Sequence, residues 1–465
     1  RAATAAQNRS FLRSIRRSFM GLLLRQLAAH GLAGRQHIVV RGLAAGDAVA
    51  HPVDARVVAV LLPAAHPLAI APAEGAEQGD QRKILQSIGA IFIVIFFIPY
   101  TASGFAACGK LFSSLFGVNY VAAMIISAIV IVGYTALGGF LAASTTDFIQ
   151  SIIMSVALII VFIFGINIAG GIPAVVENAQ SLPGYLTMMT TYDPVAGVEQ
   201  PYPIINIISM IAWGLGYFGM PHILLRFMAI EDEEKLTLSR RVATIWVVIS
   251  LAVAVLIGVI GLAMSDVGAL KTLTGSDSET IIVQIADLLS KHGILPALLA
   301  GTILAGILAS TMSTADSQLL AASSAVSSDL FGDRVAKTGD KKKAMNAARF
   351  TLLAIAVIAA FIARDPNSSV FGIVSFAWAG FGAVFGPVVL FALFWRRSNW
   401  QGALAGMISG GAMVFIWKYL VRPLGGVWNI YELLPAFSVS CLMIVIVSLL
   451  TKAPSKEITE EFDRV

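Results

Sequence analysis

Residues 213–221 read Trp-Gly-Leu-Gly-Tyr-Phe-Gly-Met-Pro, so three glycines and one proline interrupt an otherwise apolar window. Proline removes a backbone donor and clustered glycine weakens a helix, which predicts a break here. Transporters tolerate broken helices where the freed backbone lines a cavity for ions or solutes. Trp213 and Tyr217 are four residues apart and therefore share a helix face. We interpret this aromatic pair as a candidate wall of a site for a small amphipathic solute. A glycine-rich helix contact with core aromatics is the alternative.

The surrounding sequence is too apolar for a soluble domain. Of 465 residues, 57% are hydrophobic and 13% are charged, and this charged share is about half the globular norm. We therefore expect an all-α polytopic membrane protein with a transmembrane domain at 83–451 and a cytoplasmic tail at 452–465. Ten windows are long and apolar enough to span a bilayer: 84–106, 118–141, 148–170, 204–228, 242–264, 294–324, 349–363, 369–395, 402–420 and 433–450.

Lysine and arginine gather on one side of these windows. If the C-terminus lies inside, the connections on the inner side carry fifteen basic residues and those on the outer side carry six. Positively charged loops stay in the cytoplasm. The sequence therefore predicts a multi-pass protein of the plasma (inner) membrane with a cytoplasmic C-terminus.

Residues 1–82 differ in composition from the rest of the chain. They hold ten Arg, no Lys and five acidic residues, which accounts for the whole formal net charge of +5. Their best apolar stretch, residues 57–71, is interrupted by two prolines and a histidine and is too short for a span. We interpret this Arg/Ala-rich segment as out-of-frame or disordered sequence, with a basic extension or transit peptide as the alternative.

A second polar stretch lies inside the window 294–324. Residues 309–318 read Ala-Ser-Thr-Met-Ser-Thr-Ala-Asp-Ser-Gln. Sodium is a hard cation that prefers oxygen ligands, and a Ser/Thr pair on a helix can offer hydroxyls beside the carbonyl of Ser310, four residues before Thr314. Hydroxyls that bond back to i−4 carbonyls are the alternative. Asp316 is either a functional carboxylate within the membrane or a residue at its cytoplasmic mouth.

Other features carry weaker signals. Asp147 is expected on a cytoplasmic turn, where it would cap the following helix. His222 follows the glycine-rich stretch and serves either proton transfer or structure. Gly402, Gly406 and Gly410 recur every four residues, which predicts close helix packing. The sequence has no nucleotide loop, metal cluster, catalytic triad or basic aromatic stripe, which disfavours an enzyme and a nucleic-acid partner.

Four stretches occur in the order typical of one transporter family, which the chain resembles from about Gly79 to Pro454. They are Tyr134–Phe140, Trp213–Ala229, Met312–Leu320 and Ala377–Pro387. The chain closely resembles the sodium:solute symporter family. This resemblance implies a core of two inverted five-helix repeats with broken helices. The ten windows would be the last ten of the family's thirteen spans, and the first three are not recognisable before residue 82.

The resemblance also implies a function and a set of site residues. The function is sodium-coupled import of a small solute, with L-proline expected, by alternating access. Sodium, the co-transported ion, would bind Ser310, Ser313 and Thr314. The solute would lie against Trp213 and Tyr217, with Tyr134 and Pro221 nearby.

Two departures from the family leave alternatives open. Met220 stands where glutamine is usual, so another amino acid or pantothenate remains a rival solute. Without the family's first core helix the ion would keep half of its ligands, so we expect the intact gene product, and not this literal chain, to transport. A transporter-like sensor or regulatory membrane module, or a non-functional fragment, is the alternative of another class. Sodium stoichiometry and oligomeric state stay open.

Overall fold

Long apolar helices form most of the protein in a computed structural model that describes residues 78–228, 235–330 and 341–464. Two short apolar segments, Ile204–Gly219 and Asn346–Ile362, fill two of the ten expected windows. The expected all-α polytopic membrane protein is confirmed. Eight further helical segments are long and apolar enough to cross a membrane: Lys83–Phe116, Tyr120–Gly138, Ala143–Ile168, Lys235–Asp266, Ile294–Ser327, Val370–Phe394, Trp400–Leu424 and Leu433–Leu450.

The elements follow one another along the chain with short connections. The first half contains α3 (Gln78–Phe116), α4 (Tyr120–Ile168), α5 (Ile172–Ser181), β1 (Thr190–Asp193), β2 (Val198–Pro201), α6 (Ile204–Ile211), the 3₁₀ helix η1 (Ala212–Gly219), α7 (Pro221–Met228) and α8 (Lys235–Asp266). The second half contains η2 (Gly275–Thr280), α9 (Ile281–Ser290), α10 (Ile294–Ser324), η3 (Ala325–Leu330), α12 (Lys341–Ile362), α13 (Val370–Phe394), α14 (Trp400–Ile416), η4 (Trp417–Val421), η5 (Arg422–Leu424), η6 (Gly426–Trp428), α15 (Leu433–Leu450) and α16 (Lys456–Arg464).

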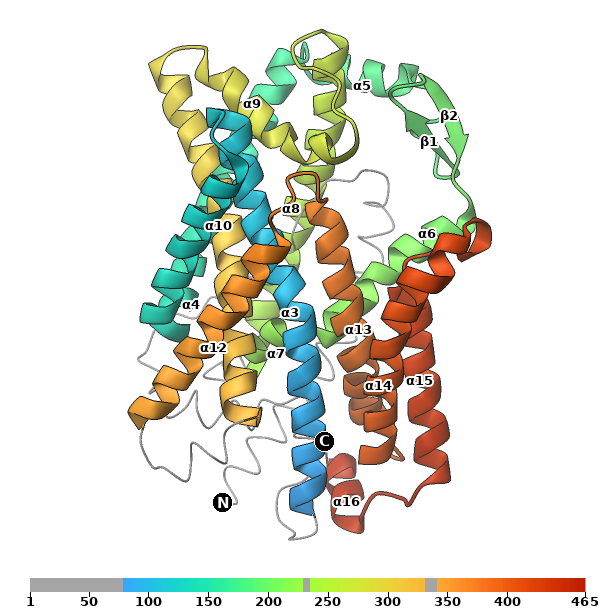
Figure 1. Ribbon diagram of the computed structural model, residues 1–465. Helices are drawn as coiled ribbons and strands as arrows, with labels where there is room; N and C mark the ends of the chain where they lie inside the picture. The colour runs from blue at the N-terminus through green and yellow to red at the C-terminus, as the bar shows by residue number, and fades with distance from the viewer. Residues whose placement is uncertain (1–77, 229–234, 331–340, 465) are drawn as a thin grey trace.

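The two ends of the helix bundle differ in what they carry. Figure 1 shows α5, α9 and the β1–β2 hairpin at one end, and α16 at the other. The hairpin is antiparallel, with Thr190 opposite Pro201. We call these the α9 end and the α16 end. The distribution of lysine and arginine predicts that the α16 end is cytoplasmic.

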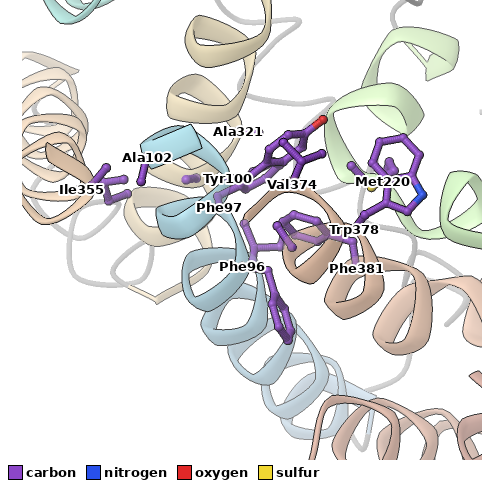
Figure 2. Packing of buried hydrophobic residues seen from close by; sticks show 14 of the residues in the cluster. Phe96, Phe97, Tyr100, Ala102, Met220, Ala321, Ile355, Val374, Trp378 and Phe381 are labelled. Atoms are coloured by element: carbon purple, nitrogen blue, oxygen red, sulfur yellow. The ribbon is translucent and has the colours of Figure 1, made fainter. Parts of the chain in front are cut away.

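The centre of the core is an aromatic contact between α3 and α13. Phe97 of α3 packs on Phe381 of α13 with ring centroids 4.5 Å apart, and Phe96 lies 5.8 Å from the same ring. Figure 2 shows these side chains together with Met220, which is fully buried beside them. Aromatic burial of this extent fixes α13 against α3. Because α13 also faces residues 213–221, this aromatic contact fixes the position of the helix that packs against the glycine-rich stretch.

The helices α14 and α15 form a close pair. A Cβ on Gly402 would lie 2.0 Å from Ser448 Oγ, and a Cβ on Gly406 would lie 2.4 Å from Ile444 Cγ1. The glycines thus let the two backbones approach, as small residues do in membrane helices. The close packing predicted from the four-residue glycine spacing is confirmed.

Several boundaries differ from the sequence expectations. The segment 1–82 lies outside the described residues except for 78–82, which begin α3. α12 begins at Lys341, eight residues before the expected window, because its lysine- and alanine-rich start favours helix. α10 continues through the polar stretch 309–318 without a break. The hydroxyls of Thr311, Ser313, Thr314 and Ser317 bond back to carbonyls of the same helix and leave the backbone ladder intact.

Candidate functional site

The predicted helix break is present at residues 212–220. α6 ends at Ile211, the chain then tightens into the 3₁₀ helix η1, and Met220 is extended with φ −80° and ψ 106°. The conformation of Met220 follows from Pro221, because a proline disfavours the α region for the residue before it. Pro221 itself begins α7, where its missing N–H leaves no intrahelical bond unmade. The span is therefore two short helices joined by an irregular segment.

Trp213 lies at the centre of a group of stacked rings. Its ring centroid is 5.4 Å from Phe371, 5.5 Å from Trp378 and 5.6 Å from Tyr431, with interplanar angles of 14–21°. The indole N–H of Trp378 donates to the Trp213 carbonyl at 3.0 Å. The acceptor carbonyl belongs to the 3₁₀ helix η1, so this bond joins α13 to the backbone of the broken span. Trp378 thus fixes both the ring and the backbone of Trp213.

Tyr217 lies one helical turn further along η1. Its ring meets the ring of Trp378 edge to face, with centroids 4.8 Å apart and an interplanar angle of 84°. Trp213 and Tyr217 therefore contact the same α13 indole, which brings the two predicted wall residues together. Pro221 is buried at the start of α7.

The hydroxyl groups of α10 converge on one carbonyl oxygen. Ser313 Oγ donates to the Ser310 carbonyl at 3.2 Å, and Thr314 Oγ1 donates to the same oxygen at 2.9 Å. The predicted closeness of these three oxygens is confirmed. The hydrogen bonds are also those of the alternative, in which the hydroxyls bond back along the helix. A hydroxyl that donates keeps two lone pairs on its oxygen, so these bonds do not prevent cation binding.

Tyr134 belongs to the α10 side of the molecule. Its hydroxyl donates to Asp316 Oδ2 at 2.8 Å and lies 3.2 Å from the Met312 carbonyl. Asp316 has no exposed surface, so its carboxylate is enclosed by protein. Tyr134 thus joins α4 to the polar stretch of α10, one turn beyond Ser313.

Next to this contact, the half-buried Arg226 joins three helices. Arg226 of α7 forms an ion pair with Asp147 of α4 and donates to Ser317 Oγ of α10 at 2.8 Å. Ser317 Oγ in turn lies 3.3 Å from Asp316 Oδ1. Buried charges persist in membranes only when they are paired. The expectation that Asp147 caps a helix is wrong, because Asp147 lies inside α4 and pairs with Arg226 instead.

Asp147, Arg226, Asp316 and Ser317 form a group that we call the polar cluster. The sequence predicts neither this cluster nor the role of Trp378. The cluster joins residues from separate spans that sequence spacing does not bring together. Trp378 lies in one of the four family-like stretches, and a lone indole in an apolar span is the available signal for it. His222, for which proton transfer was one alternative, is buried between the rings of Phe97 and Tyr100 at 5.7 and 6.0 Å.

The bundle of membrane-spanning helices and the broken helix define a helical polytopic membrane transporter. The family model described as "Sodium:solute symporter family" matches residues 77–410. The chain belongs to this family, which confirms the resemblance noted in its sequence.

Curated relatives are similar over most of the chain. The chain is 40% identical over 387 residues to the high-affinity proline transporter PutP of Bacillus subtilis (strain 168), with 83% of this chain and 77% of the relative covered. It is 39% identical to the sodium/proline symporter of Salmonella typhimurium (strain LT2), with 82% and 73% covered. These relatives are transporters and not enzymes, which agrees with the expectation from the sequence.

A solved structure shares the fold. The substrate-bound, outward-open structure of a Na⁺-coupled sialic acid symporter superimposes with a TM-score of 0.60 at 16% sequence identity, covering 94% of this chain and 98% of that chain. The long α-helices of the chain therefore adopt a known transporter architecture. The protein is an integral membrane protein of the sodium:solute symporter family.

Proposed function

We propose that the intact gene product imports L-proline together with sodium across the plasma membrane, with its C-terminus in the cytoplasm. The observation that carries this proposal is the identity of about 40% with curated proline transporters over 83% of the chain. The oxygens of Ser310, Ser313 and Thr314 on α10 suit an ion, and the aromatic wall formed by Trp213 and Tyr217 of η1 suits a small amphipathic solute. Both features lie within the residues that match the family model.

For the ion we propose a site formed by the carbonyl of Ser310 and the hydroxyls of Ser313 and Thr314. The carbonyl oxygen already accepts both hydroxyls, so three oxygens lie together without further movement of the helix. Oxygen atoms of neutral groups suit a hard monovalent cation because they add no excess negative charge. Other helices would supply the remaining ligands.

For the solute we propose the region of Trp213 and Tyr217, with Pro221 and Tyr134 as neighbouring contributors. A proline zwitterion has an apolar ring and two charged groups. Aromatic faces suit the ring and the secondary ammonium, and irregular backbone at η1 suits the charged groups. The hydroxyl of Tyr134 already bonds Asp316, so Tyr134 would act through α10 and not through the Trp213 rings.

Alternating access would couple the two ligands. If sodium and proline each favour the same conformation, each raises the affinity for the other by the same factor. The inward sodium gradient then drives proline uphill. The break at η1 divides this span into α6 and α7, and we expect these two halves to move separately.

The test measures uptake of radiolabelled proline into proteoliposomes with an imposed sodium or potassium gradient. Ser313→Ala combined with Thr314→Ala should raise the sodium concentration for half-maximal uptake by roughly tenfold or more, as the loss of about 1.4 kcal/mol of ion binding requires. The matched control is Thr302→Ala, since Thr302 bonds back to the Leu298 carbonyl at 3.2 Å on the same helix. Unchanged sodium dependence in the double variant would remove the ion site, and sodium-independent uptake would overturn the coupling.

Another solute is the rival within the same function, because Met220 is fully buried in the aromatic core and offers no polar contact. Competition of proline uptake by other amino acids and by pantothenate separates the two. Inhibition by proline at the lowest concentration supports the proposal. Stronger inhibition by any other compound assigns that compound as the solute.

A further inference from the structure

The segment Asn429–Glu432, which leads into α15, lies between the aromatic wall and the α14–α15 pair. Tyr431 is 7% exposed and Glu432 is fully buried, although both belong to a connection. Connections usually run over the surface because their backbone needs hydrogen-bond partners. Tyr431 and Glu432, the buried end of this connection, therefore need partners inside the protein.

On one side of the segment, Tyr431 joins three elements of the solute region. Its ring stacks on Trp213 of η1 at 5.6 Å and 19°. Its backbone N–H donates to Ser209 Oγ of α6 at 2.5 Å, and its hydroxyl donates to the Ser375 carbonyl of α13 at 2.7 Å. One residue thus fixes the first half of the broken helix, the wall ring and the facing helix relative to one another.

On the other side, Glu432 anchors the segment to η4 and η5, which follow α14. Its carboxylate lies 2.8 Å from Arg422 Nη1 and 3.7 Å from Lys418 Nζ. A carboxylate without exposed surface is stable only when it is paired in this way. Trp417 Nε1 also donates to the Ile430 carbonyl at 3.3 Å. The residues on either side of Tyr431 are therefore held by η4 and η5, the segments that follow α14.

We propose that Tyr431 is a positioning residue for the solute site, which holds the Trp213 ring in place and thereby sets the affinity for the solute. The proposal rests on the proposed function, in which Trp213 lines the solute site. It goes further by giving η4, η5 and the connection into α15 a part in solute binding. The contacts of Tyr431 are to α6, η1 and α13, whereas the proposed sodium oxygens lie on α10. Substitution of Tyr431 should therefore change the affinity for the solute more than the affinity for sodium.

The experiment compares proline KM, maximal rate per transporter and sodium half-saturation for two variants at this position. Tyr431→Phe keeps the stacked ring and removes the bond to Ser375, so KM should rise about threefold. Tyr431→Leu removes both interactions, so KM should rise about tenfold. Maximal rate and sodium half-saturation should stay within about twofold of the wild type. A general packing defect would instead change all three constants. The graded response, with the conservative variant retaining most of the affinity, is the expected signature.

Tyr192 of the β1–β2 hairpin provides the matched control. Its ring meets only that of Tyr185 among the described aromatic contacts, at 6.3 Å, and the hairpin lies at the α9 end. Tyr192→Phe and Tyr192→Leu should leave all three constants unchanged. An unchanged KM in Tyr431→Leu overturns the inference, and so does a KM that rises in parallel with sodium half-saturation. If Tyr431→Leu fails to accumulate in the membrane, Tyr431→Phe decides by the same criteria.

A second measurement does not depend on transport. Hydrogen exchange of the purified protein should show faster exchange in residues 209–217 for Tyr431→Leu and not for Tyr192→Leu, because the η1 backbone loses its anchor. Equal exchange in the two variants overturns the inference. A wild-type protein that shows no sodium-dependent proline uptake contradicts the proposed function instead, and the exchange data then decide the positioning role alone.

Discussion

The indole nitrogen of Trp378 occupies the space beside Gly216 that any larger residue would fill. A Cβ on Gly216 would lie 1.9 Å from Trp378 Nε1 and 2.1 Å from Cδ1. Contacts this short cannot exist, so the indole would have to move. Because the same nitrogen donates to the Trp213 carbonyl, the glycine is required for the contact that fixes the broken helix to α13.

Gly216→Ala should therefore displace Trp378 and lower the affinity for the solute. Loss of one buried hydrogen bond and of ring stacking amounts to about 1–3 kcal/mol, so KM should rise by roughly tenfold or more. Solute KM is measured in proteoliposomes with the amount of transporter quantified. Gly133→Ala is the matched control, since nothing lies within 4 Å of its added Cβ. A normal KM in Gly216→Ala would show that the Trp378 contact does not shape the site.

The ion pair between the buried Asp147 and the half-buried Arg226 should be costly to break from either side. Removing one partner of a buried ion pair leaves an uncompensated charge, which costs about 3–5 kcal/mol. Arg226→Gln and Asp147→Asn should each lower the melting temperature in detergent. The double variant should be more stable than the sum of the single changes predicts, because no charge is left unpaired. Additive effects would argue against direct coupling of the two residues.

Much of this fold follows from local sequence. Apolar windows predict the spans, and the glycine and proline cluster predicts the break, because hydrophobicity and helix propensity are properties of neighbouring residues. The polar cluster does not follow, because Asp147, Arg226 and Ser317 come from three separate spans and meet only through packing. The same holds for Tyr431, which lies 218 positions after Trp213 and yet stacks on it.

Gly410 should tolerate an added methyl group as poorly as Gly216 does, but the main effect should be on stability and not on solute affinity. Its added Cβ would lie 2.5 Å from the Ala383 carbonyl oxygen and 2.9 Å from Ser440 Cβ. The added methyl group would push α14 away from both α13 and α15. Gly410→Ala should therefore lower the free energy of unfolding by about 1–3 kcal/mol, as overpacking does. Thermal unfolding in detergent measures this, with Gly301→Ala as the control in open space. Solute KM should change less than in Gly216→Ala, because Gly410 does not touch the aromatic wall.

Glu279 links the corner of η2 and α9 to the start of α13 at the α9 end. Its carboxylate accepts bonds from Ser369 Oγ and from the N–H groups of Val370 and Phe371, and it lies 2.9 Å from Lys110 Nζ. Burial alone would raise the pKa of Glu279, but the bonds from Phe371, Lys110 and Ser369 outweigh it and hold the pKa below the ordinary value of 4.5. The ionised form is therefore the one that the fold stabilises.

A carboxylate with a lowered folded-state pKa stabilises the protein fully above its unfolded pKa. This stabilisation is lost as the pH falls through the lower, folded-state pKa. Glu279→Gln should accordingly lower the melting temperature at pH 7, through a loss of about 2 kcal/mol from hydrogen bonds to a charged group, and the difference from the wild type should shrink as the pH falls below 4.5. Asp287→Asn removes the exposed pair with Lys291, which contributes at most about 0.5 kcal/mol, and should change little at either pH. A difference for Glu279→Gln that stays constant from pH 7 to acid conditions would mean that Glu279 acts through packing and not through its charge.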